Sequence, residues 1–328
     1  MTREAFPSAT PDRVIGDTGV IVTPVAFGTS ALGSMPDTYG YEVDEERARA
    51  TIRAIFDGPA NVIDSSRNYG FGRSEARVGE VISELGGVPD GFVISTKLDR
   101  ADSGRFDADQ ARQSLEESLR ALSLDRVDVL FLHDPEYATD LHEVVGTGGS
   151  IDALFQMKAD GLADAVGLAM GRLDLMTELV GAYPFDVVLN HNRYTLLNRS
   201  ADELYSFAHD NGMAVWNAAP YAGGVLAKGA STVQRLTYSP ADDEALAPVR
   251  SIERICAEFG VPPGAAALQF SIRDPRLSTT VVGVSKPERV VTTIEWAQFE
   301  IPDELWSALS ELSYEVSDPE ANRDYTLG

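Results

Sequence analysis

The sequence has little cysteine, little histidine and little positive charge, and each shortage argues against a class of function. Cys256 is the only cysteine in 328 residues, so the chain can form no intramolecular disulfide and no thiolate metal site. The four histidines lack the spacing of zinc ligands, which disfavours a metal-dependent hydrolase. Lys and Arg number 27 against 51 Asp and Glu, and the formal charge of −24 opposes binding to nucleic acid or to an anionic membrane.

Long apolar runs are also missing. No stretch is long enough to cross a bilayer, and the charged N-terminus lacks the apolar segment of a secretory signal, so we expect a cytoplasmic protein. The glycine fingerprint of a dinucleotide-binding Rossmann unit does not occur either. Apolar residues make up 44% of the chain, an ordinary share that can still form a sizeable core.

Short β-prone runs alternate with amphipathic helical patterns along the whole chain. Most of the runs are followed by a helix and no linker separates them, so the sequence predicts one (β/α)₈ TIM barrel domain over residues 1–328, with its core at about 13–315. A hairpin around Gly16–Gly19 is expected to close the bottom of the barrel, and extra helices are expected near the C-terminal end. The eight runs begin at Val25, Asn61, Phe92, Val127, Ala165, Phe185, Met213 and Thr279.

Four local features lead to further expectations. Ser74 is a candidate N-cap for a helix that ends at Leu85. The glycine-rich loop that precedes Ser150 is expected to be mobile. The Gly- and Ala-rich segment Ala218–Pro240 is long enough to be either functional or disordered. The polar tail from Asp318 either folds over the mouth of the barrel or stays disordered.

Three successive strand candidates end in ionisable side chains. The first ends in Asp64, with Tyr69 on the loop beyond it, the second in Lys97 and the third in His133. Each residue has an ordinary explanation, because an aspartate often forms an Asx turn, a strand-terminal lysine is usually solvated and a lone histidine is usually structural. The carboxyl ends of barrel strands share one mouth, however, so three such coincidences in consecutive strands favour a catalytic site.

This ordered set carries a family resemblance. It resembles the catalytic Asp-Tyr-Lys-His tetrad of the aldo-keto reductases, and Tyr69-Gly70 followed by Ser74-Glu75 is similar to the start of that family's second helix. The resemblance extends from Gly28 to Ile294, nearly the whole chain. The four residues in question are Asp64, Tyr69, Lys97 and His133.

The four side chains suit proton transfer coupled to hydride transfer. A lysine ammonium near a tyrosine favours the phenolate and lowers the tyrosine pKa from ~10, so Lys97 is expected to activate Tyr69 while Asp64 orients Lys97. His133 can hydrogen-bond a substrate carbonyl, and Tyr69 can then give or take the proton. No side chain supplies a hydride, and the resemblance implies NADPH or NADH bound across the barrel mouth.

The resemblance also implies a cofactor-binding set. Lys286 and Arg289, at the start of a helix, are similar to the basic residues that hold an adenosine 2′-phosphate, and NADP is favoured over NAD. Two alternatives stay open: Ser285 and Glu288 form an ordinary capping box, or Glu288 accepts from a ribose hydroxyl, which favours NAD. The expected cofactor-binding residues are Gly28, Thr29, Ser30, Asp64, Asn190, Pro220, Ser285, Lys286 and Arg289.

Three positions depart from the family pattern. Ala169-Met170 stands where a Ser-Asn pair often holds the nicotinamide amide, and Ala218 stands where an aromatic residue often stacks on the ring; Asn190 can replace the usual glutamine. The apolar segment around Ala218–Tyr221 resembles the aldose 1-dehydrogenase branch, which includes L-fucose, D-threo-aldose and L-galactose dehydrogenases. This likeness implies oxidation of an aldose at C1 to a lactone.

Other functions fit the same residues. A general aldehyde or ketone reductase and a pyridoxal dehydrogenase would use the same tetrad. A non-catalytic barrel, like the ion-channel accessory subunits that resemble the family, is disfavoured by the intact tetrad. We expect a small carbonyl or sugar substrate, no metal, and no nucleic-acid or membrane partner; the sequence does not identify the substrate, the direction of reaction or the oligomeric state.

Overall fold

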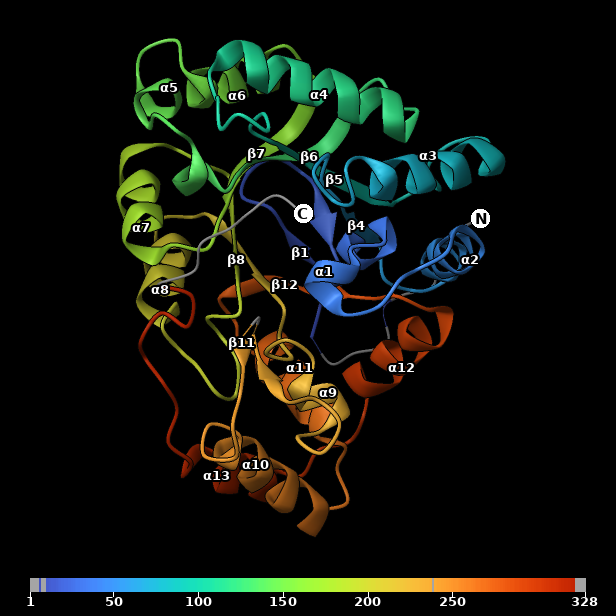
Figure 1. Ribbon diagram of the computed structural model, residues 1–328, viewed down its shortest axis with the longest axis vertical. Helices are drawn as coiled ribbons and strands as arrows, with labels where there is room; N and C mark the ends of the chain where they lie inside the picture. The colour runs from blue at the N-terminus through green and yellow to red at the C-terminus, as the bar shows by residue number, and fades with distance from the viewer. Residues whose placement is uncertain (1–5, 7–9, 238, 322–328) are drawn as a thin grey trace.

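Eight parallel strands close into a barrel, in the order β12-β3-β4-β5-β6-β7-β8-β9, and helices surround it (Figure 1). The computed structural model describes residue 6 and residues 10–237 and 239–321. The predicted TIM barrel is therefore confirmed; the N-terminal residues behind the expectation of no secretory signal lie outside the described ones. The barrel strands are β3 (Val25–Gly28), β4 (Val62–Asp64), β5 (Val93–Leu98), β6 (Val127–His133), β7 (Ala163–Ala169), β8 (Val187–His191), β9 (Ala214–Ala218) and β12 (Leu277–Gly283).

A helix follows each barrel strand and buries its apolar face against the sheet. In the helix after β5, Asp107 accepts a hydrogen bond from the backbone of Gln110, which caps the first turn, and Ala111, Leu115 and Leu122 are buried at helical spacing. The covering helices are α2 (Glu45–Phe56), α3 (Arg73–Leu85), α4 (Ala108–Leu122), α6 (Ser150–Ala159), α7 (Leu173–Ala182), α8 (Asp202–Asp210), α11 (Pro263–Ile272) and α12 (Pro287–Ala297).

Shorter elements lie between these units or flank them. The extra helices expected near the C-terminal end are present as α10 and α13, and none of the helices among the described residues has both the length and the apolar character to cross a membrane. The additional elements are β1 (Arg13–Val14), β2 (Ile21–Val22), η1 (Ser30–Gly33), α1 (Pro36–Tyr39), η2 (Pro135–Tyr137), α5 (His142–Val145), α9 (Val225–Lys228), β10 (Arg235–Leu236), β11 (Ser239–Pro240), α10 (Ala247–Glu258) and α13 (Asp303–Ser310).

The hairpin β1–β2 closes the bottom of the barrel, as predicted. Its strands pair antiparallel, and Ile15, Val20 and Val22 are buried with the inward-facing residues near the start of the barrel strands, such as Val62 and Val93. The interior above this plug is filled by large side chains, with the rings of Phe131 and Trp216 5.3 Å apart. The barrel is therefore a packed core, and a ligand can enter only at the opposite end.

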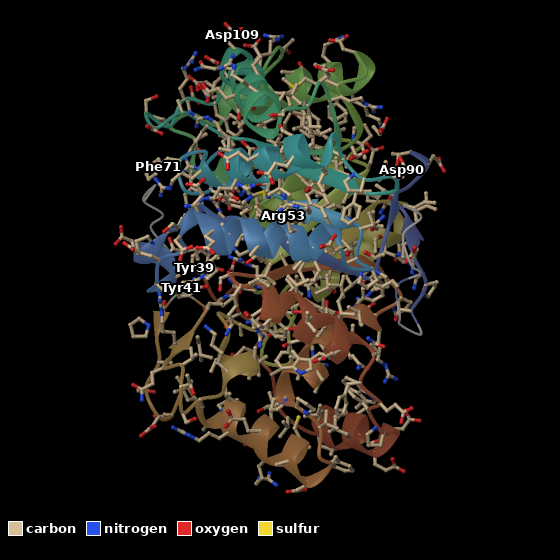
Figure 2. All side chains as sticks on the ribbon, turned by 90° about the vertical axis from the view of Figure 1, so that its right-hand side faces the viewer. Tyr39, Tyr41, Arg53, Phe71, Asp90 and Asp109 are labelled. Carbon is tan, nitrogen blue, oxygen red and sulfur yellow. The ribbon has the colours of Figure 1, made fainter. Side chains whose placement is uncertain are left out.

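Long connections cover that opposite end. Figure 2 shows Tyr39, Tyr41 and Phe71 there, whereas Asp90, which precedes β5, lies at the far end of the molecule. The segment after β9, for which function or disorder was expected, forms α9 and the β10–β11 hairpin. The loop before Ser150 contains η2 and α5; its mobility stays a prediction.

The tail folds back over the mouth. The Asp318 carboxylate lies 2.7 Å from the Arg193 guanidinium, and Glu320 accepts a hydrogen bond of 3.0 Å from Asn192. Of the two alternatives for this tail, folding over the mouth is therefore correct as far as Ala321. Residues 322–328, and residue 238 in the earlier segment, lie outside the described part of the chain.

The start of α3 differs from the expectation. The helix begins at Arg73, one residue early, so Gly72 is its N-cap and the Ser74 hydroxyl donates instead to the Thr29 carbonyl at 2.9 Å. The Ser74 cap was therefore wrong, because a contact with the neighbouring strand outcompetes capping. Gly70 has a φ of +61°, and a β-carbon there would lie 2.1 Å from the Gly33 carbonyl oxygen, so only glycine fits after Tyr69.

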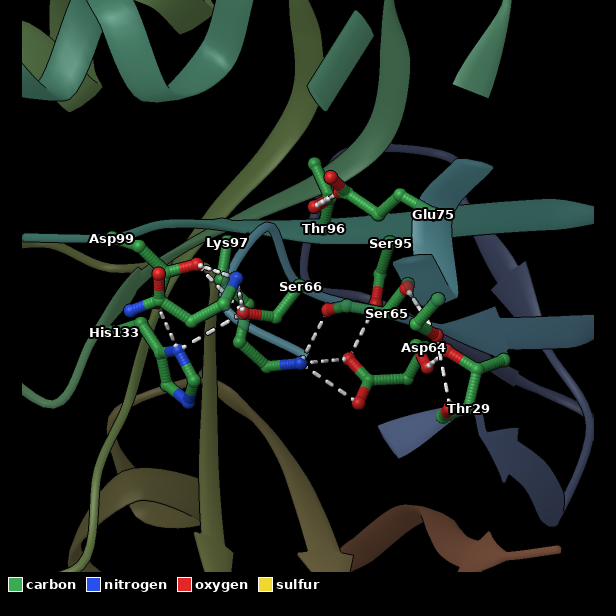
Figure 3. A network of polar contacts seen from close by, with 12 residues as sticks. Thr29, Asp64, Ser65, Ser66, Glu75, Ser95, Thr96, Lys97, Asp99 and His133 are labelled. Atoms are coloured by element: carbon green, nitrogen blue, oxygen red, sulfur yellow. Dashed lines mark hydrogen bonds and ion pairs between the residues drawn. The ribbon is translucent and has the colours of Figure 1, made fainter. Parts of the chain in front are cut away.

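Glu75 is a buried carboxyl group between α3 and the barrel. The Thr96 hydroxyl of β5 donates a hydrogen bond to it (Figure 3). Burial raises the pKa of Glu75 from 4.5 to about 7, outweighing the hydrogen bond, which lowers it. A carboxyl with a higher pKa in the folded state binds more protons folded than unfolded, so stability is lost as pH rises through about 7.

We expect Glu75→Gln to keep the hydrogen bond from Thr96 and to remove this loss. The variant should be more stable than the wild type above pH 7 by up to about 3 kcal/mol, since one pKa unit corresponds to about 1.36 kcal/mol. Below the pKa that Glu75 has in the unfolded chain, both proteins carry an uncharged side chain at position 75, and the difference in unfolding free energy should vanish. Urea unfolding at a series of pH values measures the difference.

Glu80→Gln is the matched control, because Glu80 is an exposed glutamate on the same helix. It should leave the pH dependence of unfolding as in the wild type. A stability difference between Glu75→Gln and the wild type that stays constant across the pH range would show that Glu75 is ionised in the folded protein.

Candidate active site

A pocket of about 530 Å³ opens at the carboxyl ends of the barrel strands. Asp64 and His133 are the last residues of β4 and β6, Lys97 is the last but one of β5, and Tyr69 lies on the loop that follows β4. All four side chains line the pocket, so the structure brings the whole tetrad together. Its volume lies within the ~300–1,000 Å³ of ordinary small-molecule sites.

Lys97 and Asp64 form a buried ion pair. The Lys97 Nζ lies 2.8 and 2.9 Å from the two Asp64 carboxylate oxygens and 2.6 Å from the Ser65 carbonyl oxygen (Figure 3). Ser95 donates a further hydrogen bond of 2.7 Å to Asp64. An ammonium has three N–H donors, and these three acceptors use them all. The lysine side chain is only 1% exposed, so its position is closely defined.

Tyr69 lies against this ion pair. The Lys97 Nζ is 4.7 Å from the centre of the Tyr69 ring, and the His133 ring meets the Tyr69 ring edge-on at 5.9 Å. Burial, and then the charge of Asp64, raise the pKa of Tyr69 well above its usual value of 10. The lowered pKa that was expected from Lys97 is not found, because burial raises the pKa and the charge of Asp64 adds to the rise. At neutral pH Tyr69 is therefore an uncharged phenol and a proton donor.

His133 is held by a carboxylate that the sequence reasoning missed. Its Nδ1 lies 2.7 Å from Asp99 Oδ1, and Asp99 is fully buried directly after β5 (Figure 3). The sequence argument assigned one ionisable group to each strand end, and Lys97 was the one assigned to β5. The signal was present, however, since an aspartate two residues beyond Lys97 follows the same strand.

A second carboxylate lies on the pocket side of His133. Asp134 Oδ2 is 3.8 Å from the His133 Nε2, and Asp134 itself has a φ of +46°, in the left-handed region that aspartate tolerates better than most residues. Burial opposes a charge on His133, but Asp134 and Asp99 outweigh it and raise the pKa of His133 above 6.5. Both carboxylates therefore stabilise the imidazolium form of His133 relative to the neutral ring.

Three cations gather elsewhere on the pocket wall. Lys286, Arg289 and Lys228 all line it, and partial burial, followed by the charges of Arg289 and Lys286, lowers the pKa of Lys228. Lys228 ends α9, inside the long segment for which only a general role was expected, and was missed. An anion bound beside Lys228 would offset the repulsion from Arg289 and Lys286.

The start of α12 tests the two alternatives for this region. Its N-cap is Lys286, and no side chain makes a capping hydrogen bond there, so the Ser285–Glu288 capping box does not form. Glu288 is exposed and lies outside the pocket lining, so it does not face a ligand. Lys286, Arg289 and Ser285 do line the pocket.

Two residues of the expected cofactor-binding set are not in the lining. The Thr29 hydroxyl donates to the Asp64 carbonyl, and the Asn190 amide donates 2.8 Å to the Met170 carbonyl. Side chains alternate along a strand, so Asn190 in β8 points away from the pocket that Leu189 and His191 line. Cofactor binding by Thr29 and Asn190 stays a prediction that the pocket lining does not support. The other members line the pocket: Gly28, Ser30, Asp64, Pro220, Ser285, Lys286 and Arg289.

The three departures from the family pattern all face the pocket. Ala169, Met170 and Ala218 line it together with Leu189 and Val281, and form an apolar wall. No side chain on that wall can hydrogen-bond a ligand's amide. A planar, weakly polar ring is the chemistry that such a surface accommodates.

A polar wall comes from the tail. Glu320 lines the pocket, and its carboxylate lies 3.4 Å from the His191 Nε2 and 3.3 Å from the Arg193 guanidinium. Burial opposes the charge of Glu320, but His191 and then Arg193 outweigh it and hold the pKa well below its usual range. Sequence reasoning left the tail between two states, and did not identify this carboxylate.

Comparison with known proteins agrees with the fold and with the family resemblance. A pyridoxal 4-dehydrogenase of Microbacterium luteolum is 30% identical to this chain, over 92% of the chain and 97% of the relative. An L-galactose dehydrogenase of Arabidopsis thaliana is 31% identical, over 85% of each protein. A holo aldo-keto reductase of Bacillus halodurans superimposes with a TM-score of 0.76 over 96% of this chain and 100% of its own, and at 19% identity it supports the fold alone.

The family model covers most of the barrel. The model of the Aldo/keto reductase family matches residues 24–313, a range that contains all four tetrad residues and the three pocket cations. The only pocket-lining residue named above that lies outside this range is Glu320, in the tail. The chain therefore belongs to the aldo/keto reductase family and is an oxidoreductase.

Proposed function

We propose that the pocket catalyses hydride transfer between a nicotinamide dinucleotide and the carbonyl or hydroxyl group of a small substrate. One observation carries this proposal: a single pocket of about 530 Å³ is lined both by Tyr69, Lys97, Asp64 and His133 and by a cluster of cations. The first group can move a proton to or from a substrate oxygen. The second can hold the phosphates of the cofactor.

The residues present fit this cofactor. Burial, and then the charges of Arg289 and Lys286, lower the pKa of Lys228, so a phosphate among these three cations would stabilise its charged form. The apolar wall of Ala169, Ala218 and its neighbours suits a planar nicotinamide. When bound, the cofactor would give or accept the hydride, which no side chain can do. Because Glu288 lies outside the pocket, these cations favour NADP over NAD.

The chain's own residues then move the proton. In reduction, Tyr69 is the acid, because its raised pKa keeps it protonated. His133 donates a hydrogen bond from Nε2 to the same substrate oxygen. In oxidation the proton moves the other way, from the substrate hydroxyl to Tyr69, which must then be in its phenolate form.

An aldose is the substrate class that we favour, oxidised at C1 from a cyclic hemiacetal to a lactone. Support comes from the L-galactose dehydrogenase among the relatives and from the carboxylates of Asp134 and Glu320 on the pocket wall, which can accept hydrogen bonds from sugar hydroxyls. The pyridoxal 4-dehydrogenase makes pyridoxal the second candidate. A general aldehyde or ketone reductase would use the same proton-transfer groups.

A dehydrogenase screen separates these substrates. Aldoses, pyridoxal and aromatic aldehydes or alcohols are assayed in both directions with both cofactors, by following nicotinamide absorbance. We expect the highest kcat/KM for an aldose with NADP⁺. Pyridoxal oxidation alone would support the second candidate, and absence of turnover in every assay, with no binding of either cofactor, would show that the barrel is not a nicotinamide-dependent enzyme.

Replacing Tyr69 by phenylalanine removes only the hydroxyl. Turnover should fall by roughly 10²–10⁴-fold, the usual contribution of general acid–base catalysis. Cofactor affinity should change little, because the cations that would hold the phosphates are untouched. Steady-state kinetics and fluorescence titration measure turnover and cofactor affinity.

Tyr183→Phe is the control, since the Tyr183 hydroxyl donates to the Val145 carbonyl outside the pocket lining. Near-normal turnover in Tyr69→Phe would mean that another group transfers the proton.

Replacing Lys286 and Arg289 together by alanine tests the cofactor preference. Each hydrogen bond to a charged group contributes about 1.5–3 kcal/mol, and exposure moves these two toward the low end. NADPH affinity should therefore fall by at least roughly tenfold, since ~1.4 kcal/mol is one decade. NADH affinity should barely change, because NADH has no 2′-phosphate.

The control for this double variant is Arg250→Ala with Arg254→Ala, two exposed arginines of α10 that pair with nearby carboxylates. It should leave both affinities unchanged. Equal losses for NADPH and NADH in the pocket variant, or a wild type that already prefers NADH, would mean that Lys286 and Arg289 do not bind a 2′-phosphate.

A further inference from the structure

We propose that Asp99 is a positioning residue that acts through His133: it fixes the ring with Nδ1–H directed away from the pocket and Nε2 directed toward the substrate, and it ties that ring to the loop that carries Tyr69. This inference rests on the proposed function, in which His133 contacts the substrate oxygen. Asp99 does not itself line the pocket, so it is not a catalytic residue.

The Asp99 carboxylate joins three segments of the site. Its Oδ1 lies 2.7 Å from His133 Nδ1 at the end of β6, and its Oδ2 accepts hydrogen bonds of 2.6 Å from the Ser66 hydroxyl and 3.0 Å from the Asn68 backbone N–H (Figure 3). Ser66 and Asn68 belong to the loop between β4 and α3, and Tyr69 follows Asn68 directly. One carboxylate thus holds both rings that face the substrate.

Asp99 is itself held in place. The Ser114 hydroxyl accepts a hydrogen bond of 2.8 Å from the Asp99 backbone N–H, and the Gln110 amide donates one of 3.1 Å to the Asp99 carbonyl, both from α4. The side chain is 1% exposed, so water does not compete for its oxygens. A buried carboxylate with three donors and a supported backbone is a fixed acceptor.

A fixed acceptor at Nδ1 decides which proton His133 can exchange. A carboxylate accepts but does not donate, so Nδ1 keeps its proton in both the charged and the neutral ring. Nε2 is then the atom that changes: it carries N–H in the imidazolium and a lone pair in the neutral ring. The imidazolium can donate to a carbonyl oxygen in reduction and to a hydroxyl oxygen in oxidation, so the same geometry serves both directions while Tyr69 transfers the proton.

Other charged and titratable groups surround the ring. Asp134 lies 3.8 Å from Nε2 and favours the imidazolium, Lys97 opposes it, and the uncharged Tyr69 lies edge-on to the ring at 5.9 Å. Asp134 can change the charge of His133, but it does not contact Nδ1. The Ser66 hydroxyl is also 3.3 Å from Nδ1, but it donates its proton to Asp99 Oδ2 at 2.6 Å. Asp99 is therefore the charged group in contact with Nδ1 among the described residues, and this difference makes a test possible.

Asp99→Asn should reverse the tautomer. Two donors, from Ser66 and Asn68, surround the Oδ2 position, so the single amide oxygen must lie there and the NH₂ group must face His133. Nδ1 then has to present a lone pair, and in the neutral ring the proton moves to Nε2. A charged partner is lost as well, and opposite charges at this distance usually shift a pKa by ~1–3 units.

The decisive measurement is ¹⁵N NMR of the full chain labelled at histidine, with and without NADP⁺ and with His133 assigned through His133→Gln. In the wild type we expect an Nδ1–H tautomer above the pKa of His133. In Asp99→Asn we expect an Nε2–H tautomer and a pKa lower by roughly one unit or more. An Nε2–H tautomer in the wild type would overturn the proposal even if the variant failed to fold.

Kinetics supply an independent readout. Asp99→Asn should lower kcat by at least roughly tenfold, with KM little changed, and should move the pH at which kcat changes, since general acid–base groups contribute ~10²–10⁴. In the His133→Gln background the same substitution should cost less than about twofold, because residues that act through one another are not additive. If Asp99→Asn lowers kcat by the same factor with and without His133→Gln, Asp99 does not act through His133.

Ser114→Ala is the matched control, since it disturbs the same segment but keeps the Asp99 carboxylate. It should lower the melting temperature and leave the tautomer and pKa of His133 as in the wild type. If Ser114→Ala shifts the His133 spectrum as Asp99→Asn does, the role of Asp99 is only structural. The NMR measurement does not depend on turnover. If the wild type is inactive with every substrate, the proposed function is rejected, whereas the tautomer of His133 still tests the role of Asp99.

Discussion

The buried ion pair between Lys97 and Asp64 is the interaction on which the rest of the site depends. Two charges removed from water cost more than their mutual attraction returns unless their remaining hydrogen-bonding capacity is satisfied. Here the ammonium has three acceptors, and the carboxylate has an additional donor in Ser95. Both ions are satisfied only when β4, which carries Asp64, lies beside β5, which carries Ser95 and Lys97, and the Ser65 carbonyl faces the ammonium. The register of the barrel, which pairs Asp64 with Ser95, provides that arrangement.

Each cation of the tetrad thus has its own carboxylate. Asp64 neutralises Lys97, and two carboxylates, Asp99 and Asp134, lie beside His133, so no excess positive charge is left next to Tyr69. This explains why burial, followed by the charges of these carboxylates, dominates the pKa of Tyr69. The site is therefore prepared for donation of a proton from a neutral phenol. Formation of the phenolate would depend on what a bound ligand adds or on the water that it displaces.

The sequence predicts this architecture well where one strand or one helix is enough to explain a feature. The barrel strands and the four tetrad residues could be located because apolar runs ending in ionisable groups are local signals. Thr29 and Asn190 were expected on the resemblance alone, and neither lines the pocket; for Asn190, side-chain alternation between Leu189 and His191 in β8 indicates the opposite face. Asp99, Lys228 and Glu320 matter only through partners distant in sequence, and such pairs are defined by tertiary packing.

The pocket cations also reconcile an acidic protein with an anionic cofactor. A net charge of −24 repels phosphate at long range, but at physiological ionic strength the Debye length is about 8 Å, so carboxylates on the far faces are largely screened. Lys228, Lys286 and Arg289 line the pocket, where a bound anion would contact them and screening is weak; burial, and then repulsion by Arg289 and Lys286, lowers the pKa of Lys228. The carboxylates nearest the substrate, by contrast, are paired with His133, His191 and Arg193. Local pairing rather than net charge therefore decides where an anion can bind: the proton-transfer side of the pocket is neutralised from within, and the cationic cluster is left to be neutralised by a ligand.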